Sequence, residues 1–179
     1  MAFGVAAALG VPLDVVPVRK LGAPGQPELG LGAIGEDGIR VHSPGAWDDA
    51  GVGAADLAAV EAHEAAELRR TTELLRAVRP RVDLTGRIAV VVDDGIATGS
   101  TARAAVAAAR ARGAVRVVIA VPVAPRSTVA ELAEVADEVV CLESPEPFYA
   151  VGQWYDDFAP TSDREVLTLL ATPTVPDDS

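Results

Sequence analysis

Residues 88–123 read IAVVVDDGIATGSTARAAVAAARARGAVRVVIAVPV. The stretch holds two apolar runs, Ile88 to Val92 and Val115 to Val123, separated by a Gly/Thr/Ser loop and an alanine-rich segment that reaches Arg112. Two strands joined by a helix of this length predict a βαβ unit, in which the strands are parallel and the crossover is right-handed. The alternation continues with a helix near Ser127 to Ala136 and a strand from Glu138 to Leu142. The predicted fold class is therefore α/β with a mostly parallel sheet.

The rest of the chain predicts elements around this unit. An Asp-Gly pair between β-prone runs is a strong turn signal, glycine commonly ends a helix, and apolar residues at helical spacing indicate a helix. On these grounds we expect a helix tail Ala2 to Leu9 stopped by Gly10, a strand Val11 to Val18 closed by Arg19 and Lys20, a hairpin of Glu28 to Ile34 with Ile39 to His42, a long helix Ala54 to Val78, and a last helix Asp163 to Leu170.

Composition and charge narrow the class of protein. The 179 residues fit a single domain, half of them are hydrophobic and 4% are aromatic, so the core must consist mainly of Ala, Val, Leu and Ile. A net charge of −11 disfavours nucleic acid as a partner. No segment approaches the ~20 apolar residues of a membrane span, and the N-terminus does not resemble a signal peptide. The single Cys141 allows no intramolecular disulfide. We expect a cytoplasmic protein with neither a nucleic-acid nor a membrane partner.

The segment VVVDDGIATGST, residues 90–101, carries the chemistry. It places Asp93 and Asp94 at the carboxyl end of a strand, where doubly wound sheets bind ligands. Gly95 and Gly99 allow close approach of the backbone, and the following helix N-terminus favours a phosphate. Carboxylates accept hydrogen bonds well from vicinal hydroxyls. A phosphate site beside a diol site indicates a phosphorylated ribose.

At these residues the chain resembles the type I phosphoribosyltransferases. Two acidic residues followed by a loop ending in Thr-Gly-x-Thr are similar to that family's signature for 5-phosphoribosyl-1-pyrophosphate (PRPP). The resemblance implies a three-layer fold with helices on both faces of the sheet and a small hood. It also implies that Asp93 and Asp94 bind the ribose hydroxyls and that Arg19 and Lys20 face the pyrophosphate. The 5-phosphate would be wrapped by the loop of Gly95, Ile96, Ala97, Thr98, Gly99, Ser100 and Thr101.

The implied reaction transfers ribose 5-phosphate from PRPP to a nitrogen of a base, with release of pyrophosphate. Mg²⁺ would be bound mainly through PRPP oxygens, with no direct protein ligand. Ala97 stands where hypoxanthine and guanine enzymes typically carry Asp, which makes a 6-oxopurine acceptor less expected. The sequence assigns no general acid or base. The alternative function is a PRPP- or nucleotide-binding regulatory protein of the same fold without turnover.

The segment PEPFYAVGQWYDDF, residues 145–158, resembles a poorly assigned bacterial subgroup of the family. Its aromatic residues Phe148, Tyr149 and Trp154 have two interpretations, a wall of the base pocket or a satellite hydrophobic cluster. Sequence alone does not separate them. A homodimer is also compatible with the sequence.

The resemblance predicts one more feature, at the N-terminus. Family members have a strand and a pyrophosphate-binding loop before the counterpart of residues 2–9, and neither is present here. We therefore expect residues 1–179 to form a single phosphoribosyltransferase domain that is incomplete at its N-terminus. An apolar slot would then lie between Val11 to Val18 and Ile88 to Val92.

Overall fold

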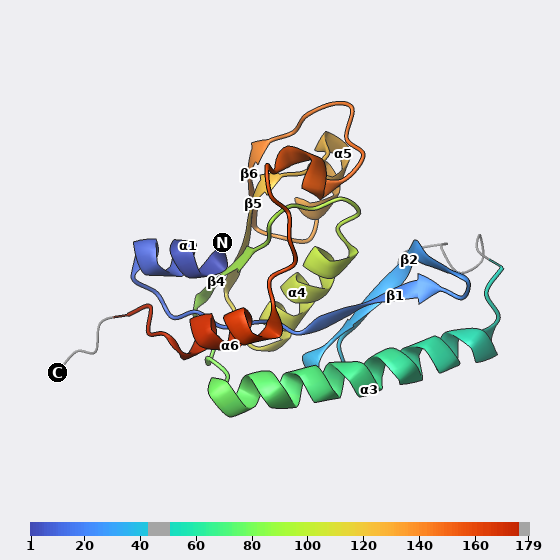
Figure 1. The fold of residues 1–179 in the computed structure, drawn as a ribbon, viewed down its shortest axis with the longest axis horizontal. Coiled ribbons are helices and arrows are strands. Elements are labelled where there is room, and N and C mark those ends of the chain that lie inside the picture. The colour runs from blue at the N-terminus through green and yellow to red at the C-terminus, as the bar shows by residue number, and fades with distance from the viewer. Residues whose placement is uncertain (43–50, 176–179) are drawn as a thin grey trace.

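A parallel sheet forms the upper part of the molecule in Figure 1. The structure, a computed structural model, describes residues 1–42 and 51–175. The sheet has the strand order β4 (Ile88–Val92), β5 (Arg116–Val123) and β6 (Glu138–Glu143), with Ile88 opposite Arg116 and Val118 opposite Glu138. The crossovers contain α4 (Ser100–Ala111) and α5 (Arg126–Leu132). The predicted parallel α/β unit is thus confirmed.

A second, antiparallel sheet projects to one side (Figure 1). It consists of β1 (Val18–Ala23), β2 (Gln26–Gly35) and β3 (Arg40–His42), in that order. The Glu36–Gly38 turn joins β2 to β3, as its Asp-Gly pair predicts, and Asp37 adopts a positive φ of 63° there. The long helix α3 (Ala54–Val78) has the predicted bounds and packs on β1 and β2.

Helix α4 lies between the two sheets, and this position explains its alanine content. Ala102, Val106 and Ala109 belong to the core under the parallel sheet. Ala104 and Ala108 are buried as well, and α4 also contacts the antiparallel sheet. A helix buried on two sides needs small side chains if the sheets are to approach it closely. The Ala-rich sequence therefore sets the spacing of the two sheets.

The prediction of a strand over Val11 to Val18 is wrong. Residues 11–17 form no strand, and β1 begins only at Val18, so Arg19 and Lys20 lie within a strand rather than at its end. A strand requires a hydrogen-bonded neighbour, and residues 11–17 have no ladder partner among the described residues. They lie across a cleft of about 540 Å³ from β4.

The cleft is lined by the N-terminal helix, by residues 11–18, by β4 and by one side of α4. The N-terminal helix α1 (Ala2–Leu9) ends as predicted at Gly10, whose φ is 62°. Ile88 and Val90 are exposed, and the described residues provide β4 with a neighbouring strand on one edge only. The cleft lies where the sequence places an apolar slot, and a further strand in it stays a prediction.

A network of charged side chains ties the antiparallel sheet to the core. The Arg76 guanidinium donates to both carboxylate oxygens of Glu36, at 2.9 and 2.7 Å, and to Asp14. Arg112 donates to the other Asp14 oxygen at 2.9 Å, and Arg81 pairs with Glu36 at 3.3 Å. Burial alone would raise the pKa of Asp14, but the hydrogen bonds from Arg76 and Arg112 hold it below its ordinary value. The network joins α3, α4, the turn after β2 and residues 11–17.

Two short helices follow the parallel sheet at the C-terminal end of the described chain. The short helix η2 (Val151–Trp154) follows β6, and α6 (Asp163–Ala171) begins with a capping box in which Ser162 and Glu165 bond each other's backbone. Helix α6 packs on α3. In the described part of the chain, no helix combines the length and the apolar character that crossing a bilayer requires.

Candidate functional site

The predicted ligand loop connects β4 to α4 at the carboxyl end of the parallel sheet. Strand β4 ends at Val92, and α4 begins at Ser100, with Gly99 as its N-cap. The Ile96 side chain is buried in the core below the loop, and its N–H donates to the carbonyl of Val123, at the end of β5, at 3.0 Å. The loop is therefore anchored in the core at Ile96. Asp94 before it and residues 97–98 after it are exposed.

The first half presents two carboxylates with different environments. Asp93 is partly buried and Asp94 is exposed. One oxygen of Asp93, Oδ1, accepts the N–H of Asp94 at 2.9 Å, so Oδ2 is left for another donor. Burial, together with the negative charge of Asp94, raises the pKa of Asp93 above its ordinary value, although the hydrogen bond from Asp94 opposes this shift. Donors that approach Asp93 would lower its pKa and stabilise the charged form.

The second half is a backbone cradle. Gly99 has a φ of 77°, a left-handed conformation that other residues rarely adopt, and no side chain caps the N-terminus of α4. Within the described residues, no acceptor meets the N–H groups of Ala97, Thr98 and Gly99. Thr98 and Thr101 are exposed and add hydroxyl donors. Free N–H groups converging at a helix N-terminus suit an anion.

Two hydroxyl groups from outside the loop hold its carbonyls, and sequence reasoning missed both. Thr128 Oγ1 donates to the Ala97 carbonyl at 2.8 Å, and the Tyr155 hydroxyl donates to the Asp94 carbonyl. A signal for Thr128 does exist in the sequence. It follows β5, and neighbouring parallel strands end at the same edge, so a hydroxyl residue early in the next helix falls beside the loop.

The segment after β6 also packs directly on the loop. A Cβ built on Gly95 would lie 2.6 Å from Cγ1 of Val151, so only glycine fits there. Phe148 and Trp154 stack with centroids 6.3 Å apart, whereas Tyr149 is 82% exposed. The structure thus brings two of the three predicted aromatic residues together, on the segment whose Val151 contacts the loop, and leaves the third exposed. Their role in a base pocket stays a prediction.

The predicted basic pair lies on β1, beside α3. Arg19 donates to Thr71 at 3.4 Å and lies 3.8 Å from a carboxylate oxygen of Glu67. Lys20 lines a separate cavity of about 430 Å³ together with His63 and other residues of α3. Arg19 and Lys20 therefore lie on the antiparallel sheet, beside α3, and not in the β4–α4 loop. Binding of pyrophosphate by these residues stays a prediction.

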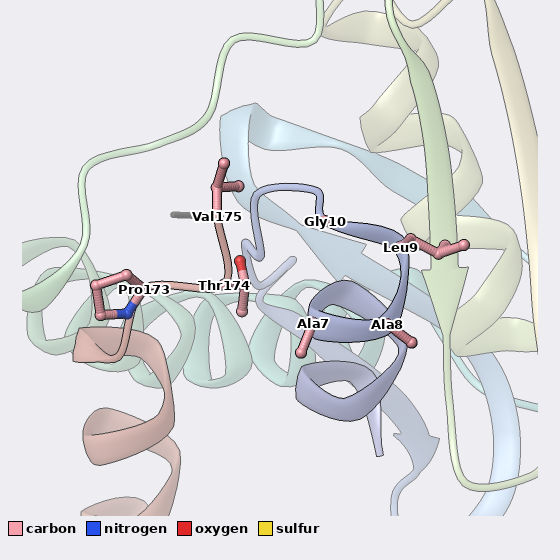
Figure 2. Close-up of a pocket in the computed structure, with 7 residues that line it drawn as sticks. All are labelled: Ala7, Ala8, Leu9, Gly10, Pro173, Thr174 and Val175. Carbon is pink, nitrogen blue, oxygen red and sulfur yellow. The ribbon is translucent and has the colours of Figure 1, made fainter. Parts of the chain in front are cut away.

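A cavity of about 780 Å³ lies between the end of α1 and residues 173–175, and Figure 2 shows the residues that line it. Its lining residues are Ala7, Ala8, Leu9, Gly10, Pro173, Thr174 and Val175. Thr174 donates to the carbonyl of Val11 at 2.7 Å, which attaches the C-terminal segment to the start of residues 11–17. None of the described residues that line it has an ionisable side chain, and this cavity is no part of the candidate site.

Comparison with known proteins addresses the family of the chain. A family model described as a phosphoribosyl transferase domain matches residues 1–158. The chain belongs to the phosphoribosyl transferase domain family. The matched range of this phosphoribosyl transferase domain includes both sheets, the β4–α4 loop and the aromatic segment, so the family predicted from the loop motif is confirmed.

Relatives of the domain support this assignment. Two proteins of Mycobacterium tuberculosis, from strains CDC 1551 / Oshkosh and H37Rv, are each 55% identical to it over 170 residues, or 95% of this chain. The second bears the name "Putative phosphoribosyl transferase Rv0571c". The chain spans 38% of the length of these curated relatives. The crystal structure of TT1426 from Thermus thermophilus superposes with a TM-score of 0.77 at 44% identity, covering 94% of this chain and 80% of that one.

Proposed function

We propose that the domain binds PRPP at the β4–α4 loop and transfers its ribose 5-phosphate group to a nitrogen of an acceptor base. The observation that carries the proposal is the juxtaposition, within one loop, of two acceptor carboxylates and a cradle of N–H groups that find no acceptor among the described residues. Asp93 and Asp94 would accept hydrogen bonds from the ribose hydroxyls. The segment Ala97 to Thr101 would donate to the 5-phosphate.

In the proposed reaction, the bond between C1 of the ribose and the pyrophosphate oxygen breaks and a bond from the base nitrogen to C1 forms. Pyrophosphate leaves with the electron pair, and a proton on the attacking nitrogen, where the base carries one, is released to water. Preorganised charges act where charge develops, so the Asp93 and Asp94 carboxylates would favour the cationic ribose ring, while the cradle holds the phosphate in place. The aromatic segment beside Gly95 is suited to stack on a base.

Mg²⁺, when bound, would neutralise charge on the departing pyrophosphate. In the part of the chain that the structure describes, no three His, Cys, Asp or Glu side chains gather into a metal site. The carboxylate oxygens of Asp93 and Asp94 are metal ligands of the type that Mg²⁺ binds. In its protein complexes this ion usually keeps waters and substrate oxygens among its ligands. The residues present therefore fit an ion that arrives with PRPP.

The alternative is a regulatory protein that binds PRPP or a nucleotide without turnover. Its specific support is Arg19, which is paired with Glu67 and Thr71 on α3. A cation engaged in this way is less available to stabilise a leaving group. In either function the β4–α4 loop has the same role.

Release of pyrophosphate separates the two functions. With PRPP, Mg²⁺ and a panel of purines, pyrimidines and nicotinate, we expect one acceptor class to give release above the rate of hydrolysis without acceptor. PRPP binding by calorimetry with no release across the panel would favour the regulatory function. Absence of PRPP binding would contradict both. Ala97 leads us to expect weaker release with hypoxanthine and guanine than with other bases.

A further inference from the structure

Besides the bond that continues the β4–β5 ladder, from the Asp93 N–H to the Ala120 carbonyl, four hydrogen bonds fix the ligand loop as far as Ala97. Asp94 N–H bonds to Asp93, Ile96 N–H bonds to Val123, and Thr128 holds the Ala97 carbonyl. The fourth is the hydrogen bond from the Tyr155 hydroxyl to the Asp94 carbonyl. Of the four, this is the one contributed by the segment after β6. It acts on the peptide group that follows the second acidic residue.

Tyr155 is itself firmly placed. Its ring packs on Phe158 with centroids 5.2 Å apart at 37°. Phe158 in turn covers Gly152, where an added Cβ would lie 2.8 Å from its ring. Burial, and then the negative charges of Asp94 and Asp93, raise the pKa of Tyr155, so the hydroxyl keeps its proton and remains a donor.

The geometry has a direct consequence for the acidic pair. The carbonyl of Asp94 and the N–H of Gly95 belong to one planar peptide group. Holding the carbonyl fixes the plane of this group, and with it ψ of Asp94 and the direction in which the Asp94 backbone carries its carboxylate. Thr128 has the corresponding effect further along, on the peptide group that opens the phosphate cradle.

We infer that Tyr155 is a positioning residue for the ribose end of the ligand site, whereas Thr128 positions the phosphate end. The inference rests on the proposed function, because it assigns the two hydroxyls to two parts of one phosphorylated ribose. Tyr155 acts through Asp94 and touches no reacting atom. It links the aromatic segment, the proposed base side of the site, to the diol-binding carboxylates.

The test compares binding of a phosphorylated ribose with binding of phosphate alone. Binding of ribose 5-phosphate and of inorganic phosphate is measured by NMR titration for the wild type and for Tyr155→Phe, which keeps the ring on Phe158. We expect the dissociation constant for ribose 5-phosphate to rise about three- to tenfold, the effect of one lost hydrogen bond. The constant for inorganic phosphate should stay within about twofold.

The matched control is Tyr149→Phe, which makes the same chemical change at a hydroxyl that is exposed and forms no hydrogen bond in the described part of the chain. It should change neither constant, because neither ligand contains a base and the predicted role of Tyr149 in a base pocket does not enter this measurement. Thr128→Val should weaken both ligands, because it loosens the phosphate cradle, and Thr128→Ser should restore them. Phe158→Leu retains the Tyr155 hydroxyl but loosens its ring, and should give a smaller loss for ribose 5-phosphate alone.

The outcomes distinguish the inference from the function on which it rests. If the wild type binds both ligands and Tyr155→Phe matches it, or weakens both ligands equally, the positioning role of Tyr155 is wrong and the proposed function stands. If the wild type binds neither ribose 5-phosphate nor PRPP, the proposed function fails and the inference fails with it.

Discussion

Replacing both acidic residues of the ligand loop, Asp93→Asn with Asp94→Asn, should weaken PRPP binding about a hundredfold or more without unfolding the domain. Hydrogen bonds to charged acceptors are worth ~1.5–3 kcal/mol each, and the variant removes both charges that we assign to the ribose. Asp94 is exposed, and the hydrogen bond that Asp93 accepts from the Asp94 N–H could also be accepted by the amide oxygen of an asparagine. Calorimetry measures the affinity, and circular dichroism reports the fold.

The matched control removes the same number of charges from a nearby acidic pair. Asp156→Asn with Asp157→Asn changes two exposed residues of the C-terminal segment. Asp157 now accepts the N–H of Ala159 at 3.0 Å, and the amide oxygen of the replacing side chain could still accept it. This variant should bind PRPP about as well as the wild type. Equal affinity of the loop variant and the wild type, with both folded, would show that the ribose hydroxyls are bound elsewhere.

Replacing Arg76 by Met should lower the free energy of unfolding by about 3 kcal/mol or more. Arg76 lies at the centre of the network between the antiparallel sheet and the core, and the Glu36 side chain that it binds is only 3% exposed. Removing one partner of a buried ion pair leaves a charge without compensation, which typically costs ~3–5 kcal/mol. Arg81 and Arg112 remain beside Glu36 and Asp14 and should keep the loss near the lower end. Urea unfolding followed by circular dichroism measures it.

Arg116→Met provides the comparison, because it also removes an arginine from an ion pair. Arg116 meets Glu138 at 2.7 Å, but both side chains are about half exposed, and exposed pairs contribute ~0.2–1 kcal/mol. We expect a small change for this variant. The double variant Arg76→Met with Glu36→Gln should recover part of the loss, because it also removes the buried carboxylate charge. Similar losses for Arg76→Met and Arg116→Met would rule out a central role for the network.

Elements with a clear pattern in their own sequence could be predicted from the sequence. Helix α3 has the predicted bounds, Ala54–Val78, because its apolar residues recur at helical spacing and Pro80 follows its end. Strand β4 has the predicted bounds as well, since Ile88 to Val92 is a continuous apolar run. The motif at residues 90–101 predicts a loop between a strand and a helix, and the structure has this loop between β4 and α4, whereas ligand binding there stays a prediction.

The strand at the start of the antiparallel sheet could not be predicted in this way. Its sequence VRKLGA contains two cations and a glycine, and it becomes a strand because β2 pairs with it and Leu21 is buried against α3. Residues 11–17 have the stronger β composition, yet the described part of the chain offers them no ladder partner. In both cases a partner outside the segment, and not the segment's own composition, decided the structure. The same is true of Tyr155, whose contact with Asp94 spans 61 residues.

Among the described residues β4 is paired on one edge only, and this divides its amide groups into two sets. The N–H of Asp93 donates to the carbonyl of Ala120 on β5. The N–H groups of successive residues in a strand point to opposite edges of that strand. The N–H groups of Ala89 and Val91 therefore face β5, and those of Ile88, Val90 and Val92 face the cleft. In heavy water the first set should retain its protons far longer than the second, so deuterium uptake along this strand should alternate from residue to residue. Any polypeptide that came to occupy the cleft as a strand would slow the second set and abolish the alternation.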